Sequence, residues 1–170
     1  MENLASQYTV LVVDDVPTNV MLVQAILKKE GYTLLTTDSG AKALRIAQER
    51  HPNLILLDIM MPEMDGITAL RAIREKSNVP VILITAKSED ADKVLGLDVG
   101  ADDYITKPFG VMELISRVKA MLRRSQKSQE KDKVLKLGNI VLDREKHSVT
   151  VGKEPVELTY KEYELLKLLM

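Results

Sequence analysis

Cysteine is absent from the chain, and histidine is limited to His51 and His147. Disulfides, thiolate zinc sites and cysteine nucleophiles are therefore excluded, and two histidines so far apart in the sequence are not expected to form a metal cluster. Any metal site in this protein has to be built from oxygen ligands, which are the ligands that hard cations prefer.

Long apolar runs and a strong excess of one charge are absent as well. No stretch approaches the roughly 20 apolar residues that a helix needs to cross a bilayer, and residues 1–8 lack the segments of a signal peptide, so we expect a cytoplasmic protein. The net charge of −1, from 24 basic and 25 acidic residues, gives no overall electrostatic case for binding nucleic acid. With 45% hydrophobic and 29% charged residues, the composition is that of a folded globular protein.

Short apolar runs alternate with stretches whose apolar residues repeat at helical spacing. Strands are predicted at Val10–Val13, Leu54–Leu57 and Val81–Ile84, with weaker ones at 33–37 and 103–106. Helices are predicted near residues 20–27, 41–49, 67–75, 90–99 and 114–122. This alternation indicates a (βα)5 unit ending near Arg124, with a doubly wound parallel sheet of the α/β class.

The pattern changes after Arg124. Residues 125–133 are polar and have no apolar periodicity, which indicates a linker. Short strands around residues 135–137, 140–142, 148–151 and 155–157, with glycine turns at 138 and 152, predict a small antiparallel sheet. Thr159 and Glu162 have capping-box spacing and open a helix whose apolar face is formed by Tyr163, Leu165, Leu166 and Leu169. We expect a partial second domain over residues 134–170.

Polar residues follow the predicted parallel strands where each strand ends: Asp14, Asp15, Asp58, Thr85 and Lys107. With the strand order 2-1-3-4-5, the three aspartates flank the point where the order reverses, which is where ligands bind in such sheets. Carboxylates this close repel one another unless a cation neutralises them, and oxygen ligands of this kind fit Mg²⁺. Beside Mg²⁺ and a lysine, an aspartate can act as a nucleophile toward a phosphoryl group.

Four segments resemble the receiver domain of two-component response regulators: Val12–Asp15, Leu56–Gly66, Ile84–Ala86 and Tyr104–Phe109. Residues 137–142 and 158–166 are similar to the start of the winged-helix DNA-binding domain of the OmpR/PhoB subfamily. The resemblance implies a flavodoxin- or CheY-like receiver over residues 1–124, a linker over 125–133, and the amino-terminal part of a truncated winged-helix domain over 134–170.

The resemblance also implies roles for the aspartates. Asp58 is expected to accept a phosphoryl group from the phosphohistidine of a sensor histidine kinase. Asp15, Asp58 and the backbone carbonyl of Met60 are expected to ligate Mg²⁺, and Asp14 to act mostly through water. Position 16 is a departure, because Val16 stands where the family usually has a third acid.

Thr85 and Lys107 are expected, by the same resemblance, to contact the phosphate, while Thr85 and Tyr104 act as the switch that reports it. The peptide between Lys107 and Pro108 is expected to be cis, an option almost restricted to X-Pro bonds. Phosphorylation is expected to promote a homodimer through charged residues near the last receiver strand and helices: Lys93, Asp102, Asp103, Glu113, Arg117 and Arg124.

Other readings remain open from the sequence. The Asp14–Asp15 pair taken alone is more typical of a helix cap. A Mg²⁺-dependent phosphatase would need a second acid near its nucleophile, whereas Asp58 is followed by Ile59 and Met60. A receiver that acts by protein contact without DNA is a third possibility. We expect a transcription-controlling response regulator with only slow self-dephosphorylation, not an enzyme. Specific promoter binding is expected of a longer parent protein, because no recognition helix is found in this chain.

Overall fold

A computed structural model of the chain describes residues 4–86, 98–144 and 146–170, without the side chains of residues 128–132. The chain divides into two compact units, residues 1–122 and 123–170. Each unit has its own sheet and its own apolar core. Within the described ranges, none of the helices combines the length and the apolar character that crossing a bilayer requires.

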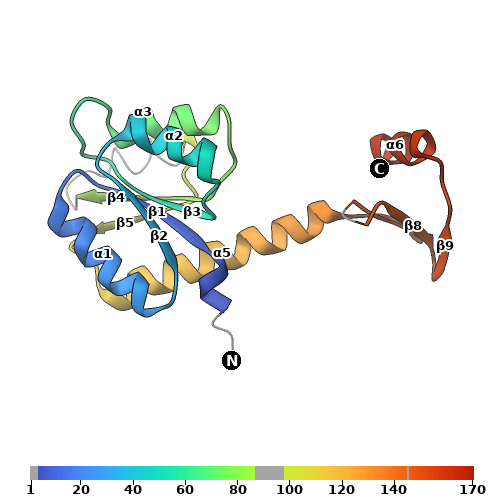
Figure 1. Ribbon diagram of the computed structural model, residues 1–170, viewed down its shortest axis with the longest axis horizontal. Coiled ribbons are helices and arrows are strands. Elements are labelled where there is room, and N and C mark those ends of the chain that lie inside the picture. The colour runs from blue at the N-terminus through green and yellow to red at the C-terminus, as the bar shows by residue number, and fades with distance from the viewer. Residues whose placement is uncertain (1–3, 87–97, 145) are drawn as a thin grey trace. The chain divides into compact units, whose positions relative to one another are not determined.

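The first unit is built on a parallel sheet of five strands in the order β2-β1-β3-β4-β5 (Figure 1). The strands are β1 (Thr9–Val13), β2 (Thr33–Thr37), β3 (Leu54–Asp58), β4 (Val81–Ala86) and β5 (Asp103–Lys107). The three continuous apolar runs form the centre of the sheet, and every residue of β3 is buried. The doubly wound fold and the strand order predicted from the sequence are confirmed.

Helices cover both faces of this sheet. Helices α1 (Pro17–Lys29) and α5 (Val111–Lys133) pack on one face, and α2 (Gly40–Arg50) and α3 (Gly66–Arg74) pack on the other (Figure 1). A short 3-10 helix, η1 (Leu4–Gln7), precedes β1. The helix expected near residues 90–99 lies outside the described residues, apart from its last two positions, 98 and 99, which are helical.

Alternation along the strands separates the core into two layers. On β1, Val10 and Val12 pack with α1 and α5, whereas Leu11 and Val13 pack with α2 and α3. We call these the α1–α5 layer and the α2–α3 layer. Each fully buried aliphatic side chain contributes about 1.5–3 kcal/mol relative to an exposed one, so both layers hold the sheet, and with it the carboxyl ends of its strands, in place.

The predicted linker is helical. Helix α5 continues through residues 125–133 and ends at Lys133. Six of the nine residues in this stretch are Lys, Gln or Glu, which have good helix propensity, and the stretch contains neither Gly nor Pro. The missing apolar periodicity in the sequence does not prevent a helix from forming, because helix propensity does not require an apolar stripe.

The second unit contains an antiparallel sheet and one further helix. Its strands are β6 (Val134–Leu137), β7 (Ile140–Asp143), β8 (Ser148–Val151) and β9 (Glu154–Val156), paired in that order. Helix α6 (Tyr160–Leu169) begins with the predicted capping box between Thr159 and Glu162. Both the antiparallel sheet and the cap agree with the sequence analysis.

The apolar face of α6 is narrower than expected. Tyr163 and Leu166 pack with Leu142 and Val149 of the sheet, whereas Leu165 and Leu169 are 59% and 72% exposed. Residues 163 and 166 are one helical turn apart and share a face, while residues 165 and 169 lie on another. Of the four residues predicted to form the apolar face of this helix, only Tyr163 and Leu166 therefore pack in the core of the second unit.

Candidate metal centre

Three carboxylates meet at the carboxyl edge of the parallel sheet. Asp14 and Asp15 follow β1, and Asp58 is the last residue of β3, the neighbouring strand. One carboxylate oxygen from each of the three lies within 4.8 Å of the others. Asp14 and Asp58 are each only 3% exposed, so their charges have little water around them. The predicted convergence of the three aspartates is therefore found in the structure.

Lys107 joins two of these carboxylates. Its Nζ atom lies 3.1 Å from Oδ2 of Asp14 and 3.0 Å from Oδ1 of Asp58. Burial lowers the pKa of Lys107, but the hydrogen bonds and charges of Asp58 and Asp14 outweigh burial and raise this pKa above its ordinary value. The lysine is therefore charged at neutral pH. Its peptide bond to Pro108 is cis, as expected.

Burial perturbs the carboxyl group of Asp58. Desolvation by burial raises its pKa from 3.8 to about 6, the hydrogen bond and charge of Lys107 oppose the rise, and the charges of Asp14 and Asp15 add to it. A pKa of about 6 leaves the group mostly ionised at pH 7 and above. Asp58 is thus an available carboxylate whose negative charge the protein stabilises poorly.

Asp14 is held by donors from its own turn. Its Oδ1 atom accepts from the backbone N–H of Val16 at 2.8 Å, and the side-chain amide of Asn19 lies 3.3 Å from Oδ1 and 3.0 Å from Oδ2. Val16, not an aspartate, is the N-cap of α1, and it makes no side-chain cap hydrogen bond. The helix-cap reading of the Asp14–Asp15 pair is therefore wrong.

The carboxylate of Asp15 has an oxygen that is available to a cation. Among the described residues, its Oδ1 atom is one of two buried side-chain oxygens without a hydrogen-bond partner, and the other is Oγ1 of Thr37. A buried carboxylate oxygen without a donor is costly unless a cation binds it. Three clustered carboxylates against one lysine leave an excess of negative charge, and an all-oxygen donor set is suited to Mg²⁺. The residues present fit this ion.

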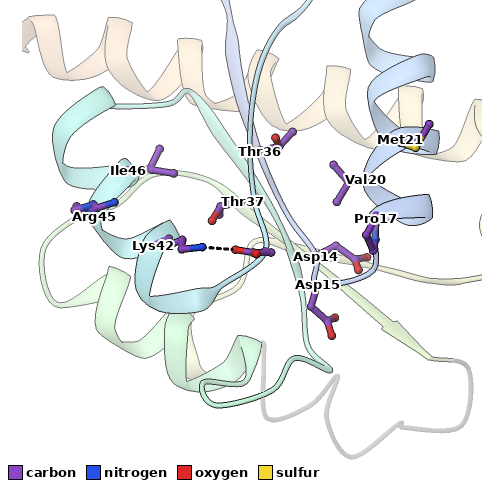
Figure 2. A pocket seen from close by; sticks show the side chains of 11 residues that line it. Asp14, Asp15, Pro17, Val20, Met21, Thr36, Thr37, Lys42, Arg45 and Ile46 are labelled. Carbon is purple, nitrogen blue, oxygen red and sulfur yellow. Dashed lines mark hydrogen bonds and ion pairs between the residues drawn. The ribbon is translucent and has the colours of Figure 1, made fainter.

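Two cavities flank Asp15. One, of about 500 Å³, opens between α1, the end of β2 and α2, and Figure 2 shows Thr37 between the side chains of α1 and those of α2. The other, of about 620 Å³, is lined by Asp15, the loop after β3 and the first turn of α3, and Met60 lies on it with 60% of its surface exposed. Asp15, which lines both cavities, and Asp14, which lines the first, are thus reachable from solvent.

A glycine sets the spacing between Asp58 and α3. The N–H of Gly66 donates to the carbonyl of Ile59 at 2.9 Å. A Cβ atom at position 66 would collide with the backbone carbonyl oxygen of Asp58 and would lie 2.8 Å from the Cα atom of Ile59. Asp65 caps the helix by accepting from the N–H of Thr68 at 2.7 Å. An Asp-Gly pair just before a predicted helix is a cap signal that can be read from the sequence.

Of the two predicted switch residues, Thr85 lies on the strand next to Asp58, and Tyr104 lies one strand further away. Thr85 is fully buried in β4, one position beyond Ile84, which pairs with Asp58. Its hydroxyl donates to the carbonyl of Ala86 at 3.2 Å. Tyr104 on β5 is partly buried and packs against the α2–α3 layer.

Most of the predicted interface residues have partners within the chain. Arg117 lies 2.9 Å from both oxygens of Asp103 and 3.3 Å from Glu113. Asp102 pairs with Arg74 at 2.8 Å. Arg124 is exposed, and Lys93 lies outside the described residues.

Comparison with known proteins identifies the first unit. Residues 10–119 match the family described as the response regulator receiver domain. The chain is 40% identical, over 95% of its length and 70% of the relative, to a Mycobacterium tuberculosis protein named as the probable transcriptional regulatory protein TcrX.

Two solved structures illustrate the structural similarity of this chain to known receiver domains. One is the receiver domain of the TMAO respiratory system response regulator TorR, at 43% identity and TM-score 0.65, covering 69% of this chain and 98% of that one. The other is the receiver domain of the Francisella response regulator 1452, at 34% identity and TM-score 0.66, covering 70% and 99%.

Proposed function

The chain belongs to the response regulator receiver family, and from this premise we propose that Asp58 accepts a phosphoryl group from the phosphohistidine of a sensor histidine kinase. Receiver domains are signalling proteins rather than classical enzymes. The observation that carries the proposal is the cluster of Asp14, Asp15 and Asp58, bridged on one side by Lys107. We place the protein in the cytoplasm, with the kinase as its partner.

The transfer is a substitution at phosphorus. A carboxylate oxygen of Asp58 attacks the phosphorus atom, the bond from phosphorus to the imidazole nitrogen breaks, and the histidine nitrogen keeps the electron pair. The attacking group has to be ionised, and a pKa of about 6 satisfies this condition at neutral pH. The product is an acyl phosphate on Asp58, which we expect the protein to hydrolyse only slowly by itself.

Charge neutralisation allows one anion to approach another in this site. Mg²⁺ would supply positive charge to the phosphoryl oxygens, held by Asp15, Asp58 and the backbone carbonyl of Met60, with Asp14 acting through water. Lys107 already lies 3.0 Å from Asp58, so its ammonium group is placed to bind a phosphoryl oxygen carried by that residue. The hydroxyl of Thr85 would donate to another.

The output of the switch is the control of transcription. Binding of the Thr85 hydroxyl to the phosphoryl group would compete with its present hydrogen bond to Ala86 and shift a pre-existing equilibrium, which Tyr104 would report. The Mycobacterium tuberculosis relative carries a transcriptional regulator's name, which supports this reading. The second unit, with its antiparallel sheet followed by a capped helix, supports assignment to the winged-helix subfamily and to DNA binding by the parent protein.

Dimerisation would use the charged face formed by β5 and α5. Asp103, Glu113 and Arg117 are paired within the chain, so a dimer that uses these charges has to exchange an internal partner for one on the second copy. Such pairs are about one-third exposed and worth little in water, so exchanging them costs little. Asp102, Arg124 and, outside the described residues, Lys93 complete the proposed interface.

The experiment is phosphorylation by a small phosphodonor. The chain is incubated with acetyl phosphate and Mg²⁺, and its intact mass is measured for wild type, Asp58→Asn and Asp98→Asn. We expect one phosphoryl group, labile in alkali, on wild type and on the exposed-site control Asp98→Asn, and none on Asp58→Asn. Chelation of Mg²⁺ should abolish the labelling. Phosphoryl transfer to Asp58→Asn would show that another residue is the acceptor.

A further inference from the structure

The departure at position 16 changes what surrounds Asp14. Val16 contributes no acid to the site, and its side chain is 41% exposed. Its backbone N–H nevertheless donates to Oδ1 of Asp14 at 2.8 Å. Three residues further on, in the first turn of α1, Asn19 brings its side-chain amide to the same carboxylate. Position 19 therefore adds a second donor to Asp14 from the same turn.

The carboxylate of Asp14 accepts nearly as many hydrogen bonds as it can. A carboxylate has about four acceptor sites. Asp14 receives three donor groups: the Val16 N–H, the Asn19 amide, which is shared between both oxygens, and the Lys107 ammonium at 3.1 Å. The contacts to these donors fall two on each oxygen, so little acceptor capacity remains on Asp14. Asp15 differs, because its Oδ1 atom is buried and has no partner within the described residues.

Of the three donors on Asp14, only two belong to its own turn. The ammonium group of Lys107 is shared with Asp58, and it would also bind a phosphoryl group carried there. Without Asn19, only the backbone N–H of Val16 and the ammonium group of Lys107 would orient the carboxylate of Asp14, and Lys107 also binds Asp58. The torsion that turns a carboxylate plane is soft, so a single fixed donor leaves it poorly defined.

We infer that Asn19 is a positioning residue for the Mg²⁺ site, because it fixes the carboxylate of Asp14 from both oxygens and leaves Asp15 as the freest ligand. This inference rests on the proposed function, in which Asp14 acts on the ion through water. A water-mediated contact needs a carboxylate in a defined orientation. The loss of a partner that orients a direct ligand typically weakens metal binding by about 10- to 100-fold, and for a partner of Asp14 we expect an effect at the lower end of this range.

The test is calorimetric titration of the full chain with Mg²⁺. Asn19→Leu keeps the approximate shape of the side chain and removes both donor contacts. We expect its dissociation constant for Mg²⁺ to rise by about 10-fold or more. In an Asp14→Asn background the same substitution should change the constant by less than about 2-fold, because residues that act as a unit are not additive.

The control is Asn53→Leu, the same substitution at an asparagine whose Oδ1 accepts from the N–H of Thr9, at the other end of β1. It should leave Mg²⁺ affinity unchanged even if it lowers stability. No Mg²⁺ binding by wild type would reject the proposed site itself. Binding by wild type with unchanged or tighter binding by Asn19→Leu, or an equal loss in the Asp14→Asn background, would overturn the role of Asn19 alone.

Discussion

Replacing Asp58 by asparagine should stabilise the metal-free protein. The residue is 3% exposed, and burial, against the opposing effect of Lys107, raises its pKa from 3.8 to about 6. A pKa that is higher in the folded state means that folding favours the protonated form. The contribution of this group to stability is therefore fully present below pH 4 and is lost as the pH rises through 6.

The magnitude follows from the shift. About two pH units at 1.36 kcal/mol each amount to roughly 3 kcal/mol between pH 4 and pH 8. Asparagine resembles the protonated carboxyl group at every pH. Without Mg²⁺, we expect Asp58→Asn to exceed wild type in its free energy of unfolding by up to about 3 kcal/mol at pH 8, and by almost nothing at pH 4.

The assay is unfolding in guanidinium chloride with a chelator present, combined with hydrogen exchange of the amides of β1, β3 and β4. Exchange of these buried strands reports on the first unit rather than on residues 123–170. Asp98→Asn, at an exposed aspartate, is the matched control and should show no such pH dependence. Adding Mg²⁺ should stabilise wild type, because the ion binds the folded state. The difference in free energy of unfolding between Asp58→Asn and wild type should then become smaller.

Two results would refute this reasoning. Equal or lower stability of Asp58→Asn at pH 8 would show that the buried charge is already compensated. A stability difference that persists unchanged at pH 4 would show that its origin is packing rather than ionisation of the carboxyl group.

Two further predictions concern the proposed dimer interface and the first residue of α3, Gly66. Arg117→Glu places an acid against Asp103 and Glu113, so it should abolish the phosphorylation-dependent dimer in sedimentation at moderate salt; unchanged self-association would remove this face from consideration. Gly66→Ala forces a methyl group to within 2.8 Å of the Cα atom of Ile59, so it should lower the free energy of unfolding by about 1–3 kcal/mol and slow labelling by acetyl phosphate. Wild-type stability and labelling rate in Gly66→Ala would mean that α3 moves away without cost.

The sheet and the aspartate cluster could be predicted from the sequence for one physical reason. Continuous apolar runs such as Leu54–Leu57 are typical of strands buried on both faces, and the carboxyl ends of parallel strands meet at one edge. Residues that directly follow such runs, among them Asp14 and Asp58, are therefore brought together whatever the loops do.

The remaining features depend on geometry that a linear pattern does not contain. Asn19 reaches Asp14 only because Val16 turns the chain into α1, and nothing in the spacing of the two residues specifies that turn. The helical stretch 125–133 has no apolar stripe, and such a stripe is the signal by which a helix is recognised in a sequence. Leu165 was placed on an apolar helix face by its residue type, although the position of a residue around a short helix decides its burial.

The separation of the core into the α1–α5 layer and the α2–α3 layer has an evolutionary consequence. Neighbouring residues of one strand, such as Val12 and Val13, pack in different layers on opposite faces of the sheet. Substitutions in different layers share few contacts, and mutations at sites without shared partners have nearly additive effects on stability. Over generations, one face can change its side chains to suit a new partner while the other keeps its ancestral packing. The carboxyl ends of the strands, which carry the aspartates, keep their positions. Partner specificity can therefore diverge in a lineage while the aspartate site stays unchanged.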